Sequence, residues 1–235
     1  MKKVLISLFL SSFLFVFIQA PAQIKFGTKA GINIATLGGK EHLFTPPTYA
    51  KLTYNLGSTI NFIIFKNYGL ESGILLSKKG AVHEQNYQFQ NGASMVRTLS
   101  FSNLFLEIPL NATYQFKVRD SYVQFFSGPY FGFGIAAKNK IKNTLYDIPE
   151  GITIDTESYP DKIVKIQYSA DGYQSKDFGF NFGAGIIINK FFYKIQYGLG
   201  TTDIYHNIKS KNRVVGISIG FMFGGKNDLH QWQIC

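Results

Sequence analysis

The sequence predicts an all-β protein, an eight-stranded antiparallel up-and-down transmembrane β-barrel that is exported to an outer membrane. Three observations predict this fold. The chain begins with a segment typical of export signals, eight later segments alternate apolar residues with small or polar ones, and the connections between these segments alternate between long and short.

The N-terminal segment has the three parts of a signal peptide. Lys2 and Lys3 are positively charged, Val4 to Ile18 is nearly all apolar, and Ala20-Pro21-Ala22 resembles a cleavage motif that would leave Gln23 first. The apolar stretch is shorter than the about 20 residues that a spanning helix needs. Cleavage and export are therefore expected, with a retained N-terminal anchor helix as the alternative.

Composition agrees with strands that lie against lipid. Phe and Tyr number 23 and 14 against one Trp, and Gly also numbers 23. Loss of two lysines with the signal lowers the formal charge from +10 to +8. For an exported chain this basic excess favours anionic headgroups over nucleic acid as the partner. We divide the chain into a signal peptide (1–22), an outer-membrane β-barrel (23–223) and a polar C-terminal tail (224–235). The single cysteine, Cys235, excludes an intrachain disulfide.

The first expected strand, Ile24 to Ala35, shows the alternation clearly. One face carries Ile24, Phe26, Thr28, Ala30, Ile32 and Ile34, and the other carries Lys25, Gly27, Lys29, Gly31 and Asn33. In a barrel the first set meets lipid and the second points into the lumen. The chain after the expected signal peptide holds no run of 18 apolar residues, which excludes a helical membrane protein.

The next three expected strands are Thr53–Phe65, Tyr68–Lys79 and Thr98–Tyr114. Their apolar faces carry Tyr54, Leu56, Ile60, Phe62 and Ile64, then Tyr68, Leu70, Ile74 and Leu76, then Leu104, Leu106, Ile108, Leu110 and Tyr114. The residues on their opposite faces are mostly small or polar, so each of these three strands is expected to have one lipid-facing side.

The last four expected strands are Tyr122–Ala137, Lys176–Asn189, Phe191–Tyr205 and Arg213–Phe223. Their apolar faces are rich in Phe and Ile, whereas glycine recurs on the opposite faces. An even number of strands is what a closed single-chain barrel needs, and small inward residues suit a narrow, packed lumen.

The connections are expected to sort by length. The long ones are roughly 36–52, 80–97, 138–175 and 206–212, and the short ones are 66–67, 115–121 and 189–190. Barrels of this class have short periplasmic turns and longer outer loops. A periplasmic N-terminus would place every long connection outside. We interpret residues 138–175 as a protruding hairpin and the best place for an envelope protein partner to bind, with a variable exposed loop as the alternative.

Two charged groups are the candidate sites. Inward charges are expected to form an ion-pair network in place of an apolar core, because a buried unpaired charge costs several kcal/mol; they are Lys25, Lys29, Glu71, Glu107, Asp177 and Lys194. A polar conduit or ligand site is the alternative. A basic rim is expected at the outer ends of the strands, either simply solvated or in contact with lipopolysaccharide phosphates; it comprises Lys78, Lys79, Lys138, Lys140, Lys142, Lys176, Lys209, Lys211 and Arg213.

No catalytic, cofactor or metal site is predicted. The four histidines fall in expected loops or in the tail, without the spacing of zinc ligands, and no nucleophile elbow or phosphate-binding loop occurs. His83 with Glu84, and Asp203 with His206, are the nominal candidates for a lipid-modifying or proteolytic barrel, the enzymatic alternative. A soluble periplasmic β-barrel that binds lipid is another.

Several short segments carry a family resemblance: residues 26–33 (FGTKAGIN), 106–110 (LEIPL), 128–130 (GPY), and 177–179 with 183–185 (DFG and GAG). These segments resemble the PorT-like outer-membrane β-barrel proteins common in Bacteroidetes. The resemblance implies an outer-membrane barrel without catalytic residues to carry over. It also implies a second hypothesis for function, an accessory component of a type IX-like protein-secretion complex. The leading hypothesis is a non-enzymatic barrel with a structural or interaction role through its extracellular loops.

Overall fold

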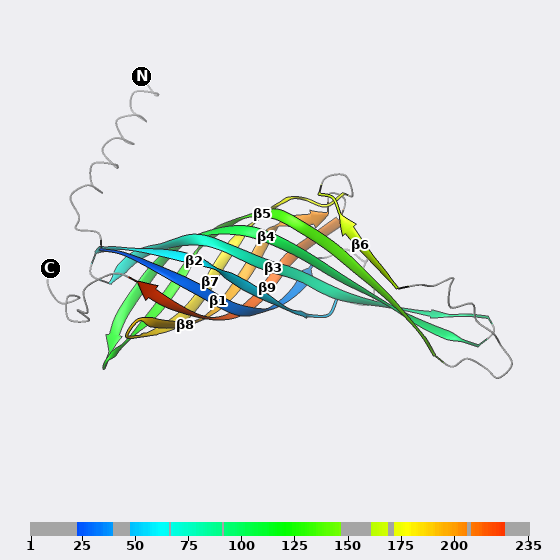
Figure 1. Cartoon of the computed structure of the whole chain (residues 1–235), viewed down its shortest axis with the longest axis horizontal. Coiled ribbons are helices and arrows are strands. Elements are labelled where there is room, and N and C mark those ends of the chain that lie inside the picture. The colour runs from blue at the N-terminus through cyan, green and yellow to red at the C-terminus, as the bar shows by residue number, and fades with distance from the viewer. Residues whose placement is uncertain are drawn as a thin grey trace, which may run out of the picture.

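The computed structural model describes residues 23–39, 48–65, 67–90, 92–146, 161–168, 172–205 and 208–223. These residues form the strands shown in Figure 1: β1 (Gln23–Gly38), β2 (Lys51–Phe65), β3 (Tyr68–Gln88), β4 (Ser94–Val118), β5 (Ser121–Tyr146), β6 (Lys162–Ile166), β7 (Lys176–Ile188), β8 (Phe191–Tyr205) and β9 (Ile208–Phe223). None of the described residues forms a helix with the length and hydropathy that a membrane crossing requires. The expected signal peptide and C-terminal tail lie outside the described residues.

Eight of these strands close into one antiparallel ring. The order is β4-β3-β2-β1-β9-β8-β7-β5, and pairing of β4 with β5 closes it. The first and last strands lie side by side, with Gly31 opposite Ser218. Consecutive strands of the ring pair with each other throughout, so the predicted eight-stranded up-and-down barrel is confirmed. The short β6 stands outside the ring and pairs only with β5.

The barrel is apolar outside and polar inside. On β1, Phe26 and Ile32 are 58% and 55% exposed, whereas Lys29 and Asn33 on the opposite face are 5% and 2% exposed. Outward rows continue across neighbouring strands, as where Ile32 pairs with Ile217. Large apolar side chains over a whole wall are stable only against hydrocarbon, because in water such a surface would drive association. The apolar residues of the alternating strands therefore face outward and the polar residues face the lumen, as the sequence predicted.

The turns at one end of the barrel are short. β2 and β3 are joined by residues 66–67, β4 and β5 by Arg119-Asp120, and β7 and β8 by Asn189-Lys190. Arg119 and Asn189 have φ of 55° and 54°, the left-handed conformation that tight hairpin turns use. β1 also begins at this end, since Gln23 pairs with Ile63 near the β2–β3 turn.

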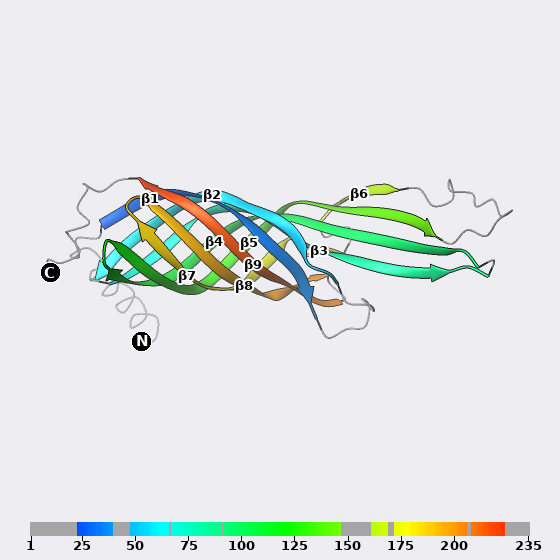
Figure 2. The same cartoon turned by 90° about the horizontal axis from the view of Figure 1, so that it is seen from below.

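Three strands continue far beyond the opposite end of the barrel. β3, β4 and β5 remain paired up to Gln88–Ser94 and Ser94–Tyr146, and together they project as a sheet (Figures 1 and 2). At about 3.3 Å per residue, the segment from Gly80 to Gln88 alone adds about 30 Å. We call residues 80–88, 94–103 and 137–146 the extension.

The ends of the strands correct three expected loops, two of them in the extension. The connection expected at 80–97 is mostly strand, and the one expected to begin at Lys138 begins after Tyr146. The long connection expected at 206–212 is also wrong, because β8 ends at Tyr205 and β9 begins at Ile208. Outside the membrane no face of a strand has to meet hydrocarbon, so the hydrophobic alternation ends before the hydrogen-bond ladder does.

Part of the expected hairpin at 138–175 is present. β6 pairs antiparallel with β5, from Ala137–Ile166 to Ile141–Lys162. The peptide N–H of Asn143 donates to Asp161 Oδ1 at 3.0 Å, just beyond this ladder. The hairpin thus lies along the base of the extension.

Candidate functional site: the charged lumen and the outer rim

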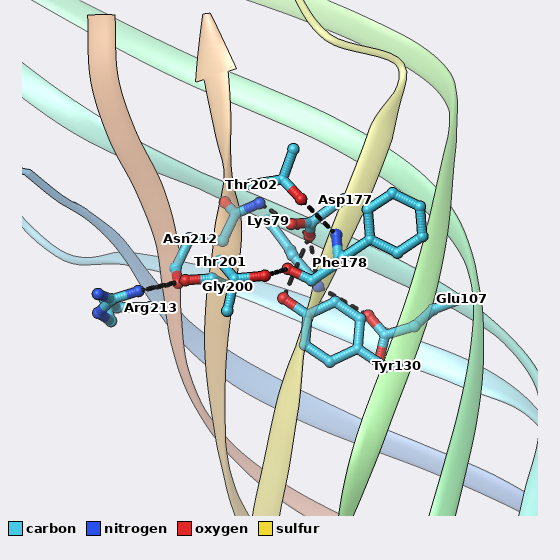
Figure 3. A network of polar contacts seen from close by, with 10 residues as sticks. All are labelled: Lys79, Glu107, Tyr130, Asp177, Phe178, Gly200, Thr201, Thr202, Asn212 and Arg213. Atoms are coloured by element: carbon cyan, nitrogen blue, oxygen red, sulfur yellow. Dashed lines mark hydrogen bonds and ion pairs between the residues drawn. The ribbon is translucent and has the colours of Figure 1, made fainter.

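One cluster of buried charges fills the outer half of the lumen. The Lys79 ammonium on β3 lies 2.7 Å from Glu107 Oε2 on β4 and 3.0 Å from Asp177 Oδ2 on β7. Figure 3 shows the three side chains converging from different walls of the barrel. All are at least 96% buried, so their charges are stabilised by each other and not by water.

Neutral partners complete this cluster. Asn212 Nδ2 donates to Asp177 Oδ2 at 3.0 Å, and the Tyr130 hydroxyl donates to the same oxygen at 3.4 Å. Lys79 Nζ also lies 4.0 Å from the centre of the Tyr130 ring, a cation–π distance. Near it, the Thr202 hydroxyl accepts from the Phe178 N–H at 2.9 Å, which ties β8 to β7 beyond their regular ladder (Figure 3). The hydrogen bonds from Asn212 and Tyr130 fix the Asp177 carboxylate in one position.

A second cluster fills the inner half. Lys194 on β8 forms an ion pair with Glu71 on β3. Its ammonium lies 4.9 Å and 5.1 Å from the ring centres of Phe192 and Phe126. Nearby, Lys29 donates to Gln196 Oε1 at 3.2 Å. In the inner half of the lumen, lysine charge is therefore held by one carboxylate together with aromatic faces and an amide.

The inward glycines make room for these aromatic rings. A Cβ on Gly220 would collide with the Phe192 ring, and one on Gly183 would collide with the Phe126 ring. A Cβ on Gly179 would come within 2.6 Å of the Tyr130 ring. The sequence predicted that small inward residues suit a narrow, packed lumen; the structure shows that the glycines admit aromatic rings, against which the lysines pack.

We expect Gly220→Ala to lower the free energy of unfolding by about 1–3 kcal/mol, the usual range for forced overpacking. Gly198→Ala is the matched control, because its Cβ would meet no atom closer than 3.3 Å. Urea unfolding in lipid vesicles measures both. An equal loss of stability in the two variants would contradict the steric role of Gly220.

The lumen is closed toward both ends. At the end with the short turns, Tyr122, Ile187 and Phe192 form a buried apolar cluster, with Met222 packed against it. The cavity above it measures about 30 Å³, room for a water or two. The lumen is therefore a packed interior there, and not an open pore.

Tyrosines cover the opposite mouth. The Tyr173 and Tyr205 hydroxyls lie 2.8 Å apart, and Asn139 Nδ2 donates to the Tyr173 hydroxyl at 2.8 Å. Tyr168 donates to the Ala136 carbonyl at 3.2 Å. Burial raises the pKa of Tyr168 to about 12, so this hydroxyl keeps its proton over the physiological pH range.

The buried lumen charges balance. Among the buried side chains that the structure describes, the lumen holds three lysines and three carboxylates, namely Lys29, Lys79 and Lys194 with Glu71, Glu107 and Asp177. The described residues contain no group of three His, Cys, Asp or Glu side chains arranged for a metal. Because each carboxylate faces a lysine, the arrangement is suited to holding the barrel in shape.

The expected rim does not form one continuous collar. Lys79 was expected there and instead lies in the lumen, because the inward alternation of β3 continues through Ser77 to Lys79. Arg213 donates to the carbonyls of Gly200 and Asn212 at 2.8 and 3.0 Å, which makes it a tie between β8 and β9. The remaining rim residues divide into Lys78, Lys138, Lys140 and Lys142 on β3 and β5, Lys209 and Lys211 on β9, and Lys176 at the start of β7.

Sequence reasoning missed Lys51. It lies at the start of β2, inside the connection expected at 36–52, and its ammonium donates to three oxygens of β4. A polar stretch read as a loop offers no periodicity from which such a contact could be inferred. The serines that it binds, Ser100 and Ser102, alternate along β4, which is the only signal in the sequence.

The geometry of a closed barrel with an apolar outer wall agrees with the family comparison. The model for the outer membrane protein β-barrel domain matches residues 17–206, most of the chain. The chain belongs to this family. No curated protein sequence matches it.

The chain also matches solved structures of several bacterial proteins. Ail of Yersinia pestis is 9% identical with a TM-score of 0.38, over 86% of this chain and 99% of Ail. Neisserial surface protein A is 11% identical with a TM-score of 0.36, over 84% and 97%. OprG from Pseudomonas aeruginosa is 12% identical with a TM-score of 0.33, over 86% and 95%. Membership of the outer membrane β-barrel family supports an outer-membrane location for this chain.

Proposed function

We propose that this outer-membrane β-barrel is a non-enzymatic anchor that holds its extension outside the cell for a protein partner. The observation that carries the proposal is the continuation of β3, β4 and β5 beyond the barrel as paired strands. With the short turns in the periplasm, as is usual for such barrels, the extension is extracellular. The charge-balanced, closed lumen supports a structural role for the barrel itself.

Side chains stiffen the extension across its three strands. Arg97 on β4 lies 5.3 Å from the centre of the Tyr87 ring on β3, and its Nε donates to Asn143 Oδ1 on β5 at 3.0 Å. One guanidinium therefore ties all three strands together. A segment fixed in this way loses little conformational entropy on binding, which favours affinity.

The tip of the extension has the composition of an interaction surface. Tyr87 and Tyr146 are 39% and 51% exposed there. Together with Met95 they line a shallow hollow of about 510 Å³ among the described residues. Tyrosine is enriched at protein interfaces, where an aromatic ring contributes large contact area at low entropic cost.

The double variant Tyr87→Ser/Tyr146→Ser tests this function. We expect affinity capture of the tagged, full-length protein from solubilised outer membrane to recover a stoichiometric protein partner. Recovery should fall about tenfold or more in the variant, since aromatic residues at an interface centre commonly contribute more than about 1.4 kcal/mol.

Val118→Ser is the control, because Val118 is exposed on β4 at the opposite end of the barrel. It should capture the partner as the wild type does. Absence of any stoichiometric partner, or equal capture by the double variant, would reject the proposed role. The identity of the partner also decides the narrower PorT-like hypothesis, because a component of a secretion complex would place the chain in that machinery.

A further inference from the structure

One face of the sheet at the base of the extension gathers lysines and serines. In the antiparallel ladders Ser102 lies opposite Lys138, Ser100 lies opposite Lys140, and Leu104 lies opposite Lys78. Directly opposed residues and alternate residues on one strand share a face of a sheet. We call Lys51, Lys78, Ser100, Ser102 and Lys138 the lysine–serine face.

Lys51 is built into this face. Its ammonium donates to Ser100 Oγ and Ser102 Oγ, each at 2.6 Å, and to the Phe101 carbonyl at 3.0 Å. All three acceptors are neutral, so the positive charge is held in place without being cancelled. Because each serine oxygen accepts from Lys51, its own hydroxyl proton points elsewhere. Ser100 is half-buried and can therefore donate to a ligand.

The positive charge of the face is not neutralised within the described part of the chain. The charged groups that act on Lys51 are Lys78 on β3 and Lys138 on β5, both cations, while β4 presents only serines. Among the described residues, the salt bridges of lysines lie in the lumen. Three cations drawn together without a carboxylate repel one another, and an anion between them would remove that cost.

The face begins where the lipid-facing wall ends. Along β4, Ser102 is followed on the same side by Leu104, Leu106 and then Ile108, which is 38% exposed on the lipid-facing wall. Lys78 lies 5.5 Å above the centre of the Tyr54 ring, and Tyr54 is 47% exposed on the same wall. Tyrosines at this depth mark the boundary between hydrocarbon and headgroups.

We propose that the lysine–serine face binds the phosphate of an outer-leaflet lipid of the lipid A type, whose acyl chains lie along the apolar wall below. The proposal rests on the extracellular orientation inferred above. Lys51 and Lys138 supply charge to the phosphate, Lys78 approaches it from β3, and the Ser100 hydroxyl donates a hydrogen bond.

The proposed contact depends on pH. Burial and the neighbouring Lys78 and Lys138 lower the pKa of Lys51 to about 8. Below this pKa Lys51 carries its charge, and above it the charge is lost. Phosphate binding should therefore weaken between pH 7 and pH 9.5. Lys51→Arg should retain binding at pH 9.5, because guanidinium remains charged.

The test titrates the detergent-solubilised full-length protein with phosphorylated lipid A and counts bound lipid by native mass spectrometry. Dephosphorylated lipid A and inorganic phosphate are the two comparison ligands. We expect Lys51→Gln to weaken binding of phosphorylated lipid A about tenfold, as befits loss of a charge-assisted contact. Lys117→Gln, an exposed lysine at the opposite end of β4, should bind as the wild type does.

Each outcome decides the proposal. Weaker binding in Lys51→Gln, with binding restored by Lys51→Arg, supports it. Equal binding by Lys51→Gln, or equal binding of dephosphorylated lipid A, overturns it. Displacement of lipid A by an equal concentration of inorganic phosphate overturns the lipid assignment. Heat-modifiable mobility on gels confirms that every variant is folded, and capture of a protein partner does not enter this readout.

Discussion

Lys194→Met is expected to lower the free energy of unfolding by about 3–5 kcal/mol, the usual cost of removing one member of a buried ion pair. The substitution leaves the Glu71 carboxylate, 3% exposed, without its lysine partner. Glu71→Gln should also destabilise the barrel, because it leaves Lys194 without its carboxylate. Urea unfolding of the protein in phosphatidylcholine vesicles gives the free energies.

The double variant Lys194→Met/Glu71→Gln distinguishes an ion pair from two independent contacts. We expect it to lose less stability than the sum of the two single variants, since neither buried charge then remains alone. Additive losses would show that the two residues do not stabilise each other. The same cycle applies to Lys79 and Asp177, with a smaller coupling because Lys79 keeps Glu107.

Ile219→Arg is expected to cost about 2–4 kcal/mol, because it places a charge in the middle of the lipid-facing wall. Ile219 is 46% exposed, lies midway along the outward-facing row from Val215 to Phe223 on β9, and pairs with Ala30 near the middle of β1. The free energy of unfolding in vesicles is again the measurement.

Leu52→Arg is the control, because it introduces the same charge at a different depth in the membrane. Leu52 is 69% exposed at the outer end of β2, where arginine should cost only about 0–1 kcal/mol. A similar cost at both positions would be inconsistent with a membrane around this wall. The comparison therefore tests membrane insertion itself.

The part of the fold inside the membrane could be predicted from the sequence because hydrocarbon constrains every second residue. On β9, for example, the outward-facing residues at alternate positions from Val215 to Phe223 must be apolar because they contact hydrocarbon. The two-residue period is therefore visible along this part of the strand. The extension escaped prediction for the converse reason. Around His83 and Glu84 both faces of the strand lie outside the membrane, so hydrogen-bonded strand and loop have the same composition.

The lumen could be predicted in composition but not in pairing. Glu71, Lys194 and Asp177 could be assigned to the interior from alternation alone. Which carboxylate meets which lysine depends on the register between strands far apart in the sequence, since Lys194 and Glu71 are separated by 123 positions. Lys79 was misplaced because the strand was taken to end at that residue, although alternation from Glu71 already pointed it inward.

The extension has a mechanical consequence. Its strands run from the tip into the barrel wall, and the hydrogen bonds between antiparallel strands lie perpendicular to the strands. A pull on the tip therefore loads these bonds in shear, where many must break together, and not one after another as in unzipping. Tension applied to the tip from outside the cell would be transmitted directly to the barrel in the bilayer, because β3, β4 and β5 run without interruption from the extension into the barrel wall.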